Sequence, residues 1–228
     1  MNRKLTAGLL IVAAVLTNVA FTMLGSIFDY PDVLKKPTDD ILAAFTAHQA
    51  AVVGWFVVLA LSAALFAPIA IGVGRLASNR AMRAAVPIGI AAAVVQVVGL
   101  SRWAILVPGY AARGDRDAFE TAHHVLGTLI GETLGYALTA AWTLLVLVAL
   151  GRAFAGRWFL ALGGAAAVLI ALGVVSPLGV PGVDLANFLG YVLWSVWLVA
   201  FAVVLLWTSR RSPISRHERL PSRTPMPS

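Results

Sequence analysis

Residues 50–73 read AAVVGWFVVLALSAALFAPIAIGV, an apolar run that holds no charged side chain. A helix needs about 20 apolar residues to cross the roughly 30 Å of hydrocarbon in a bilayer. Backbone groups in hydrocarbon must bond internally, so such a run is expected to be a helix. Pro68 cannot donate a hydrogen bond to the carbonyl of Ala64, so the helix should kink there. This stretch predicts a membrane-spanning helix.

Apolar runs of similar length occur five more times. They are Leu5–Phe28, Ala84–Val107, Val125–Leu150, Trp158–Leu178 and Leu185–Trp207. The chain is 60% hydrophobic and 12% charged, whereas a soluble domain is typically about 25% charged. The first run is too long for the apolar core of a signal peptide, so it should remain as a helix. The sequence predicts an all-α, polytopic membrane bundle of six transmembrane helices within residues 1–208.

Lysine and arginine residues are divided unevenly between the two sides of these spans. Most lie at both chain ends and in the loops after the second and fourth spans, and few lie in the other loops. The positive-inside rule then places both termini in the cytoplasm, in a bacterial plasma membrane. The net charge of +7 follows from this topology, so it does not indicate nucleic-acid binding. Residues 209–228, rich in Ser, Pro and Arg, predict a disordered basic cytoplasmic tail.

Two helices should begin before the bilayer. PTDD at residues 37–40 offers a cap and an acidic first turn, and Asp117 with Glu120 resembles a capping box. Each helix would then run about 35 residues, or near 50 Å.

Short matches suggest internal repetition. AAFTAH at 43–48 resembles AFETAH at 118–123, and LGYALTAAW at 134–142 resembles LGYVLWSVW at 189–197. Three related helical hairpins would explain both matches, although apolar segments also match by chance.

The polar residues of AHHVLGTLIGETLGY, at 122–136, follow a helical spacing. In an α-helix one stripe would hold Glu120, His124, Thr128, Glu132 and Tyr136, beside a second stripe of Gly127, Gly131 and Gly135. Glycines at this spacing allow another helix to approach closely. The polar stripe should therefore face protein, with Glu132 near the middle of the membrane.

Arg102, in the preceding span, is the expected partner of Glu132. In an antiparallel hairpin Arg102 falls level with Thr128 to Glu132, where a bidentate ion pair could form. One interpretation is an ion pair that fixes helix register. The other is a cavity in which Arg102 holds an anionic group while Glu132, with Thr128, Tyr136 and His124, completes the site.

Histidines allow a second kind of site. His48 and His123 occupy matching positions in the repeat, and Glu120 could add a carboxylate, so a divalent metal or haem is an alternative cofactor. Adjacent histidines diverge on a helix, however, and no HExxH spacing occurs. The chain has no cysteine, which excludes thiolate sites and disulfides.

Three segments resemble a known family. LGSIFDYPDVLKKPTDDILAAF, GLSRWAILVPG and FETAHHVLGTLIGETLGYALTAAW are similar to actinobacterial members of the family called domain of unknown function 4386. The resemblance covers nearly the whole chain up to the tail. It implies a polytopic bacterial membrane protein and supplies no reaction, ligand or catalytic residues.

These observations favour a non-enzymatic membrane protein. It would bind or pass a small molecule or lipid through an outward-facing cavity between helices, with no cofactor, surrounded by the bilayer. The alternatives are a metal or haem redox protein and a structural or regulatory subunit. Neither a Walker A motif nor a G-x-S-x-G motif occurs, so the sequence favours no enzyme class.

Overall fold

The computed structural model describes residues 2–210, and these form a bundle of helices without a strand. Six stretches are long and apolar enough to cross a membrane: Arg3–Phe28, Gln49–Gly74, Arg80–Arg113, Arg116–Ala155, Arg157–Leu178 and Val183–Thr208. The predicted all-α, six-span architecture is therefore confirmed. All but the first two residues of the predicted tail, 209–228, lie outside the described residues.

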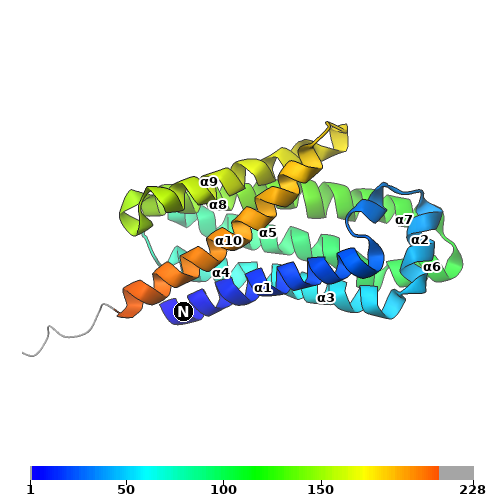
Figure 1. Cartoon of the computed structure of the whole chain (residues 1–228), viewed down its shortest axis with the longest axis horizontal. Coiled ribbons are helices and arrows are strands. Elements are labelled where there is room, and N and C mark those ends of the chain that lie inside the picture. Colours follow the sequence, from blue (N-terminus) through cyan, green and yellow to red (C-terminus); the bar gives the residue numbers. More distant parts are fainter. Residues whose placement is uncertain (1, 211–228) are drawn as a thin grey trace, which may run out of the picture.

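The bundle is elongated, with short helices gathered at one end (Figure 1). Its elements are α1 (Arg3–Phe28), η1 (Asp32–Lys35), α2 (Thr38–Ala47), α3 (Gln49–Ala64), α4 (Phe66–Gly74), α5 (Arg80–Ile105), α6 (Val107–Arg113), α7 (Arg116–Ala122), η2 (His123–Leu134), α8 (Gly135–Ala155), α9 (Arg157–Leu172), η3 (Gly173–Leu178) and α10 (Val183–Arg210). Helix α5 packs against α3, α4, α8 and η2, whereas α1 packs against α3 and α10. The end that carries α2, α6 and α7 is called the cap end below.

The second span is broken where its proline predicts a break. Helix α3 ends at Ala64 and α4 begins at Phe66, with Leu65 between them. This position is one turn before Pro68, whose missing N–H leaves the carbonyl of Ala64 without its usual donor. The predicted kink is confirmed.

The long second helix predicted from Pro37 onward is wrong, because the chain turns at His48. This residue has φ −132° and ψ 29°, and it separates α2 from α3. Helix α2 lies across the cap end of the bundle (Figure 1). Its Phe45 is fully buried, with its ring 6.0 Å from that of Trp103. The burial of Phe45 against Trp103 therefore stabilises the turn more than a straight, continuous helix would be stabilised.

The fourth span does run well beyond the bilayer thickness, from Arg116 to Ala155. Its cap differs from the expected one, because Asp115 accepts a hydrogen bond from the amide of Ala118 at 3.2 Å. Glu120 does not complete a capping box and instead accepts a hydrogen bond from Thr38 of α2 at 2.6 Å. A surface contact between α2 and α7 thus replaces the predicted capping box.

Matched residues of the two LGY segments contact each other. The rings of Tyr136 and Tyr191 lie 5.8 Å apart, and those of Trp142 and Trp197 lie 6.1 Å apart. The fourth and sixth spans run in the same direction, so equivalent residues meet at equal depth. The contacts agree with related helices, while the three-hairpin repeat stays a prediction.

Candidate functional site

Residues His123–Leu134 of the fourth span form a π-helix, flanked by α7 and α8. In this geometry each N–H bonds to the carbonyl five residues back, and such segments occur frequently at functional sites. A π-helix has more residues per turn than an α-helix, and residues four apart still lie on roughly one face. Of the predicted polar stripe, Thr128, Glu132 and Tyr136 are half-buried and His124 is exposed.

The glycines of this segment face α5, which is the close helix contact that their spacing predicts. Gly127, Gly131 and Gly135 lie against Arg102, Gly99 and Gln96, respectively. A Cβ added at Gly99 would lie 2.5 Å from the Cα of Gly131, closer than any real contact. The two backbones therefore touch at Gly99 and Gly131. This contact sets the distance between α5 and η2 for the side chains beside it.

Arg102 is buried in the contact between α5 and η2, with only 4% of its surface exposed. Its Nη1 donates to the carbonyl of Gly99, and its Nη2 lies 3.4 Å from Nδ1 of His123. The guanidinium also lies 5.3 Å from the ring centroid of Trp103 and covers the space where Gly127 lacks a side chain. Its Nε has no hydrogen-bond partner. The guanidinium is enclosed on all these sides by protein.

The predicted ion pair between Arg102 and Glu132 is wrong. Among the described residues, no oxygen of Glu132 lies within 4.0 Å of a guanidinium nitrogen. Arg102 lies level with Gly127 and His123, more than one turn before Glu132.

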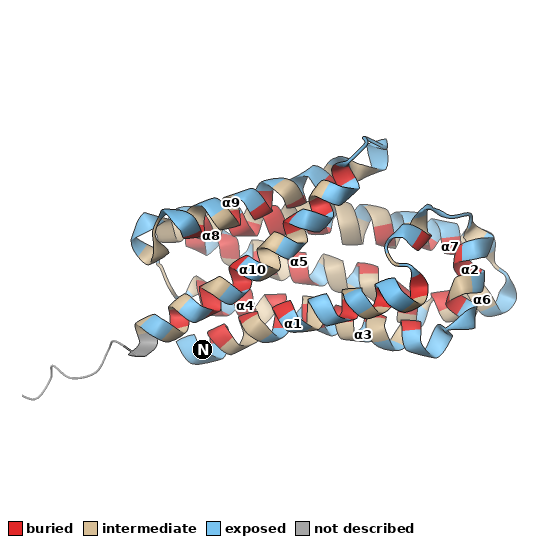
Figure 2. Ribbon diagram, in the orientation of Figure 1, coloured by how far each residue is buried: buried red, intermediate tan, exposed pale blue. Residues whose placement is uncertain are grey.

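Glu132 is only half-buried, and within residues 2–210 its side chain has neither an ion pair nor a hydrogen bond. Tyr136, four residues further along the same span, packs its ring 5.8 Å from the ring of Tyr191 on α10. Burial raises the pKa of Tyr30, and the negative charge of Glu132 raises it further. Each tyrosine is half-buried. Figure 2 shows few fully buried residues on the stretch between α7 and α8, which is η2.

The other residues of the predicted polar stripe are divided between environments. Thr128 is half-buried and His124 is exposed, whereas it is His123 that points toward Arg102. The structure thus places His123 beside Arg102 and leaves His124 exposed, whereas the prediction assigned His124 to the site with Arg102.

The residues proposed for metal binding do not come together. His48 and Glu120 are exposed, and His123 stacks on Phe119 with 5.7 Å between ring centroids. Within residues 2–210, no three His, Asp or Glu side chains are grouped closely enough to hold a metal ion. Metal or haem binding therefore stays a prediction that no contact in the structure favours.

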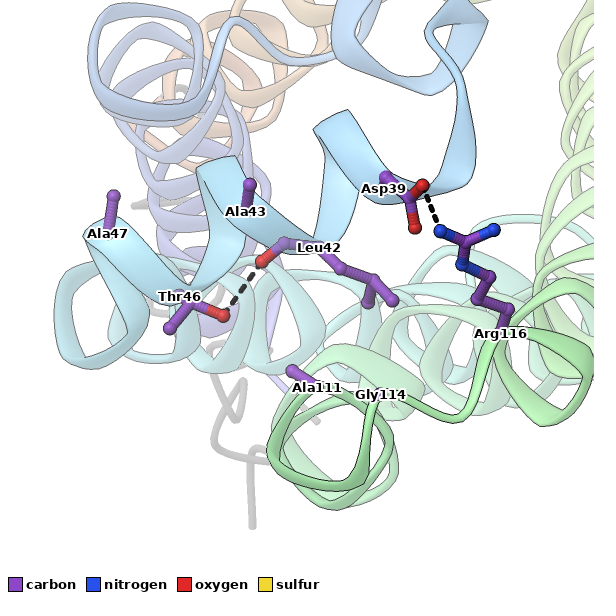
Figure 3. A pocket seen from close by; sticks show the side chains of 8 residues that line it. All are labelled: Asp39, Leu42, Ala43, Thr46, Ala47, Ala111, Gly114 and Arg116. Carbon is purple, nitrogen blue, oxygen red and sulfur yellow. Dashed lines mark hydrogen bonds and ion pairs between the residues drawn. The ribbon is translucent and has the colours of Figure 1, made fainter.

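A hollow of about 590 Å³ lies at the cap end, between α2 and the α6–α7 turn (Figure 3). Leu42 and Ala111 line it, and its charged residues Asp39 and Arg116 form an ion pair with each other. Since these charges already neutralise one another, the hollow presents no unmatched group to a ligand. The unmatched carboxylate lies elsewhere, at Glu132.

Sequence reasoning did not single out Tyr30. Tyr30 follows α1, and its ring lies 5.6 Å from Phe21 and 5.2 Å from Phe56. It thus points inward, and only the loop conformation could show this. Gln96 of α5 donates a hydrogen bond to Thr139 of α8 at 3.0 Å.

These features define a multi-pass integral membrane protein built as a helical bundle, with the half-buried carboxylate of Glu132 in its fourth span. The family model described as Domain of unknown function (DUF4386) matches residues 5–202, and the chain belongs to this family. The resemblance noted from the sequence is therefore confirmed. No curated protein and no solved structure matches the chain.

Proposed function

We propose that this protein binds a small molecule or lipid in the outer half of a bacterial plasma membrane, without catalysing a reaction. The excess of basic residues at both termini supports a cytoplasmic location for them. The cap end, with η2 beside it, then faces outward. The binding site is centred on Glu132 and Tyr136.

The carrying observation is the unpartnered carboxylate of Glu132. An ionisable group inside a membrane span is costly, so it commonly pairs with another group or serves a ligand or ion pathway. Glu132 has no protein partner among the described residues, although Arg102 of the adjacent helix carries the opposite charge. A bound ligand would supply the missing partner.

Arg102 has a different role in this proposal. Its guanidinium already contacts Gly99, His123 and Trp103, and it is covered by η2. A ligand could reach it only after the helices separate. Arg102 therefore holds the two helices together and contributes its positive charge from a distance.

A groove on α1 favours a lipid among the candidate ligands. It measures about 240 Å³ and is lined by Asn18, Val19, Thr22 and Met23. The amide of Asn18 donates to Ser195 of α10 at 3.0 Å, so the groove lies where α1 meets α10. A groove on an apolar span, lined by α1 alone, is accessible to acyl chains.

The test compares ligands that remain bound to the purified protein. Wild type, Glu132→Gln and Glu120→Gln would be extracted under the same mild conditions and measured by native mass spectrometry. Glu120 is the matched control, since it is an exposed carboxylate on the same span. We expect a retained molecule in wild type and the control that Glu132→Gln loses. Equal retention in all three, or no retained molecule, would contradict the proposal.

The structural-subunit alternative gives a different result in the same experiment. It requires that Glu132→Gln lower the thermal stability of the protein while bound molecules are unchanged. The two readouts together therefore separate a ligand site from a purely structural carboxylate.

A further inference from the structure

We propose that the end of the bundle opposite the cap end binds the headgroups of anionic phospholipids. This inference goes beyond the proposed function, because it concerns the other half of the bundle and shares no residue with the site at Glu132. The surface is formed by the turn between α4 and α5 and the turn between α8 and α9, which both lie at that end (Figure 1). It is called the basic surface below, and its residues are Arg75, Arg80, Arg83, Arg152 and Arg157.

A hydrogen bond holds the two turns of the basic surface side by side. The side-chain amide of Asn79 donates to the carbonyl of Ala149 near the end of α8 at 2.8 Å. The amide oxygen of Asn79 also accepts from the backbone of Met82 at 3.0 Å, which caps α5 and fixes the side chain. Asn79 directly precedes Arg80, and Ala149 lies three residues before Arg152. The arginines of the two turns therefore flank one direct contact.

The positive charges of the basic surface have no protein counter-charge. No aspartate or glutamate occurs in residues 41–114 or 133–183, the two stretches that contain these turns. All five arginines are exposed, and within residues 2–210 none of them forms an ion pair. At the cap end, by contrast, Lys35, Lys36 and Arg116 are each paired with an aspartate. The anions for the basic surface are therefore left to a partner.

The neighbours of these arginines favour lipid over a soluble partner. Trp158, which follows Arg157, is exposed, and so is Val148, four residues before Arg152. Exposed apolar side chains on a span face the acyl chains, and tryptophan is enriched at the boundary between membrane and water. The arginines therefore lie at the depth of the headgroups, where phosphates already adjoin them. An acidic protein or a nucleic acid would have to approach from the water.

A lipid with two phosphates fits a surface made of two turns. A guanidinium binds a phosphate through two parallel hydrogen bonds, and basic groups at the cytoplasmic ends of spans attract anionic lipids. Cardiolipin carries two phosphates, so one lies at the α4–α5 turn while the other lies at the α8–α9 turn. Phosphatidylglycerol carries one phosphate and contacts one turn at a time. Phosphatidylethanolamine has no net charge and should bind most weakly.

The experiment measures native mass spectra and thermal stabilisation of the full-length protein in a neutral detergent. The probes are cardiolipin, phosphatidylglycerol and phosphatidylethanolamine, with a single-stranded oligonucleotide as a polyanion that is soluble in water. We expect cardiolipin to bind about tenfold more tightly than phosphatidylethanolamine, with phosphatidylglycerol between them. Equal binding of the three lipids would overturn the proposal. Stabilisation by the oligonucleotide without a preference for anionic lipid would also overturn it.

A double variant tests the two turns together. Arg80→Gln combined with Arg152→Gln removes one charge from each turn and should weaken cardiolipin binding about tenfold. Arg113→Gln is the matched control, because Arg113 is an exposed arginine at the cap end without an ion pair among the described residues. It should bind cardiolipin as wild type does. Unchanged binding by the double variant would overturn the proposal.

Further variants keep the test decisive, because the same arginines also orient the protein in the membrane. If the double variant fails to insert, each single glutamine variant should still weaken cardiolipin binding several-fold. Arg80→Lys combined with Arg152→Lys keeps both charges and should keep the preference for anionic lipid. Loss of that preference in the folded lysine variant would show that charge does not select the lipid and would overturn the proposal. Glu132→Gln should leave cardiolipin binding unchanged, so this proposal and the proposed function fail separately.

Discussion

Arg102 and Glu132 carry opposite charges on adjacent spans, yet the two side chains differ in burial and in contacts. Arg102 is buried against a backbone carbonyl, a histidine, an indole ring and a glycine. Glu132 is half-buried, and no protein group within residues 2–210 bonds to its side chain. The difference indicates that the arginine stabilises the contact between two helices, while the glutamate is available to a ligand. A charge inside a membrane protein is therefore best interpreted from its contacts rather than from its presence alone.

The largest expected effect comes from breaking the contact between Gly99 of α5 and Gly131 of η2. Gly99→Ala places a Cβ 2.5 Å from the Cα of Gly131, so α5 and η2 must move apart. We expect a loss of about 3 kcal/mol in the free energy of unfolding, from overpacking against backbone. Chemical unfolding in detergent would measure it. Gly8→Ala is the control, because an added Cβ there has no neighbour within 4 Å. Equal stability of both variants would show that the contact can relax.

Removal of the arginine tests its structural role. Arg102→Ala deletes a buried side chain together with its hydrogen bonds, and we expect a loss of about 2–3 kcal/mol in unfolding free energy. Ligand binding, measured per folded molecule, should fall less than in Glu132→Gln. If Arg102→Ala were fully stable and yet lost all binding, Arg102 would belong to the ligand site.

Neutralisation of the glutamate tests the other half of the comparison. Glu132→Gln removes a charge that has no described protein partner, so the unfolding free energy should change by less than about 1 kcal/mol. The sign should be neutral or stabilising, because burying an amide costs less than burying a carboxylate. The same unfolding assay, without added lipid, measures this change. A loss above about 2 kcal/mol would reveal a protein partner for the carboxylate.

The smallest effect is expected at the cap end, where Asp39 and Arg116 pair on the surface. Both side chains are more than half exposed, so Asp39→Asn should cost only about 0.5 kcal/mol and leave lipid binding unchanged. Thermal unfolding at low and high salt would measure it, with Asp117→Asn as an exposed control. A much larger loss would mean that the cap end stabilises the site at Glu132.

Much of the architecture could be predicted from local signals in the sequence. Apolar length gave the six spans, Pro68 gave the break near Ala64, and the glycines gave the close contact with α5. The turn at His48 was missed because neither Gly nor Pro marks it, and the packing of Phe45 on Trp103 decides it. The π-helix was missed because spacings of four and five residues both fit the pattern of residues 123–134. The expected ion pair is absent because Arg102 lies level with Gly127 and His123, more than one turn before Glu132.

The touching glycines have a consequence for the rest of the fourth span. If residues 123–134 rewound as an α-helix, α7 would rotate relative to α8 around the axis of the span. That rotation would move Gly131 away from its contact with Gly99. A side chain at either position would block the observed arrangement, whereas the two glycines permit the backbones to meet. The absence of two Cβ atoms thus sets the rotational phase of a 40-residue span.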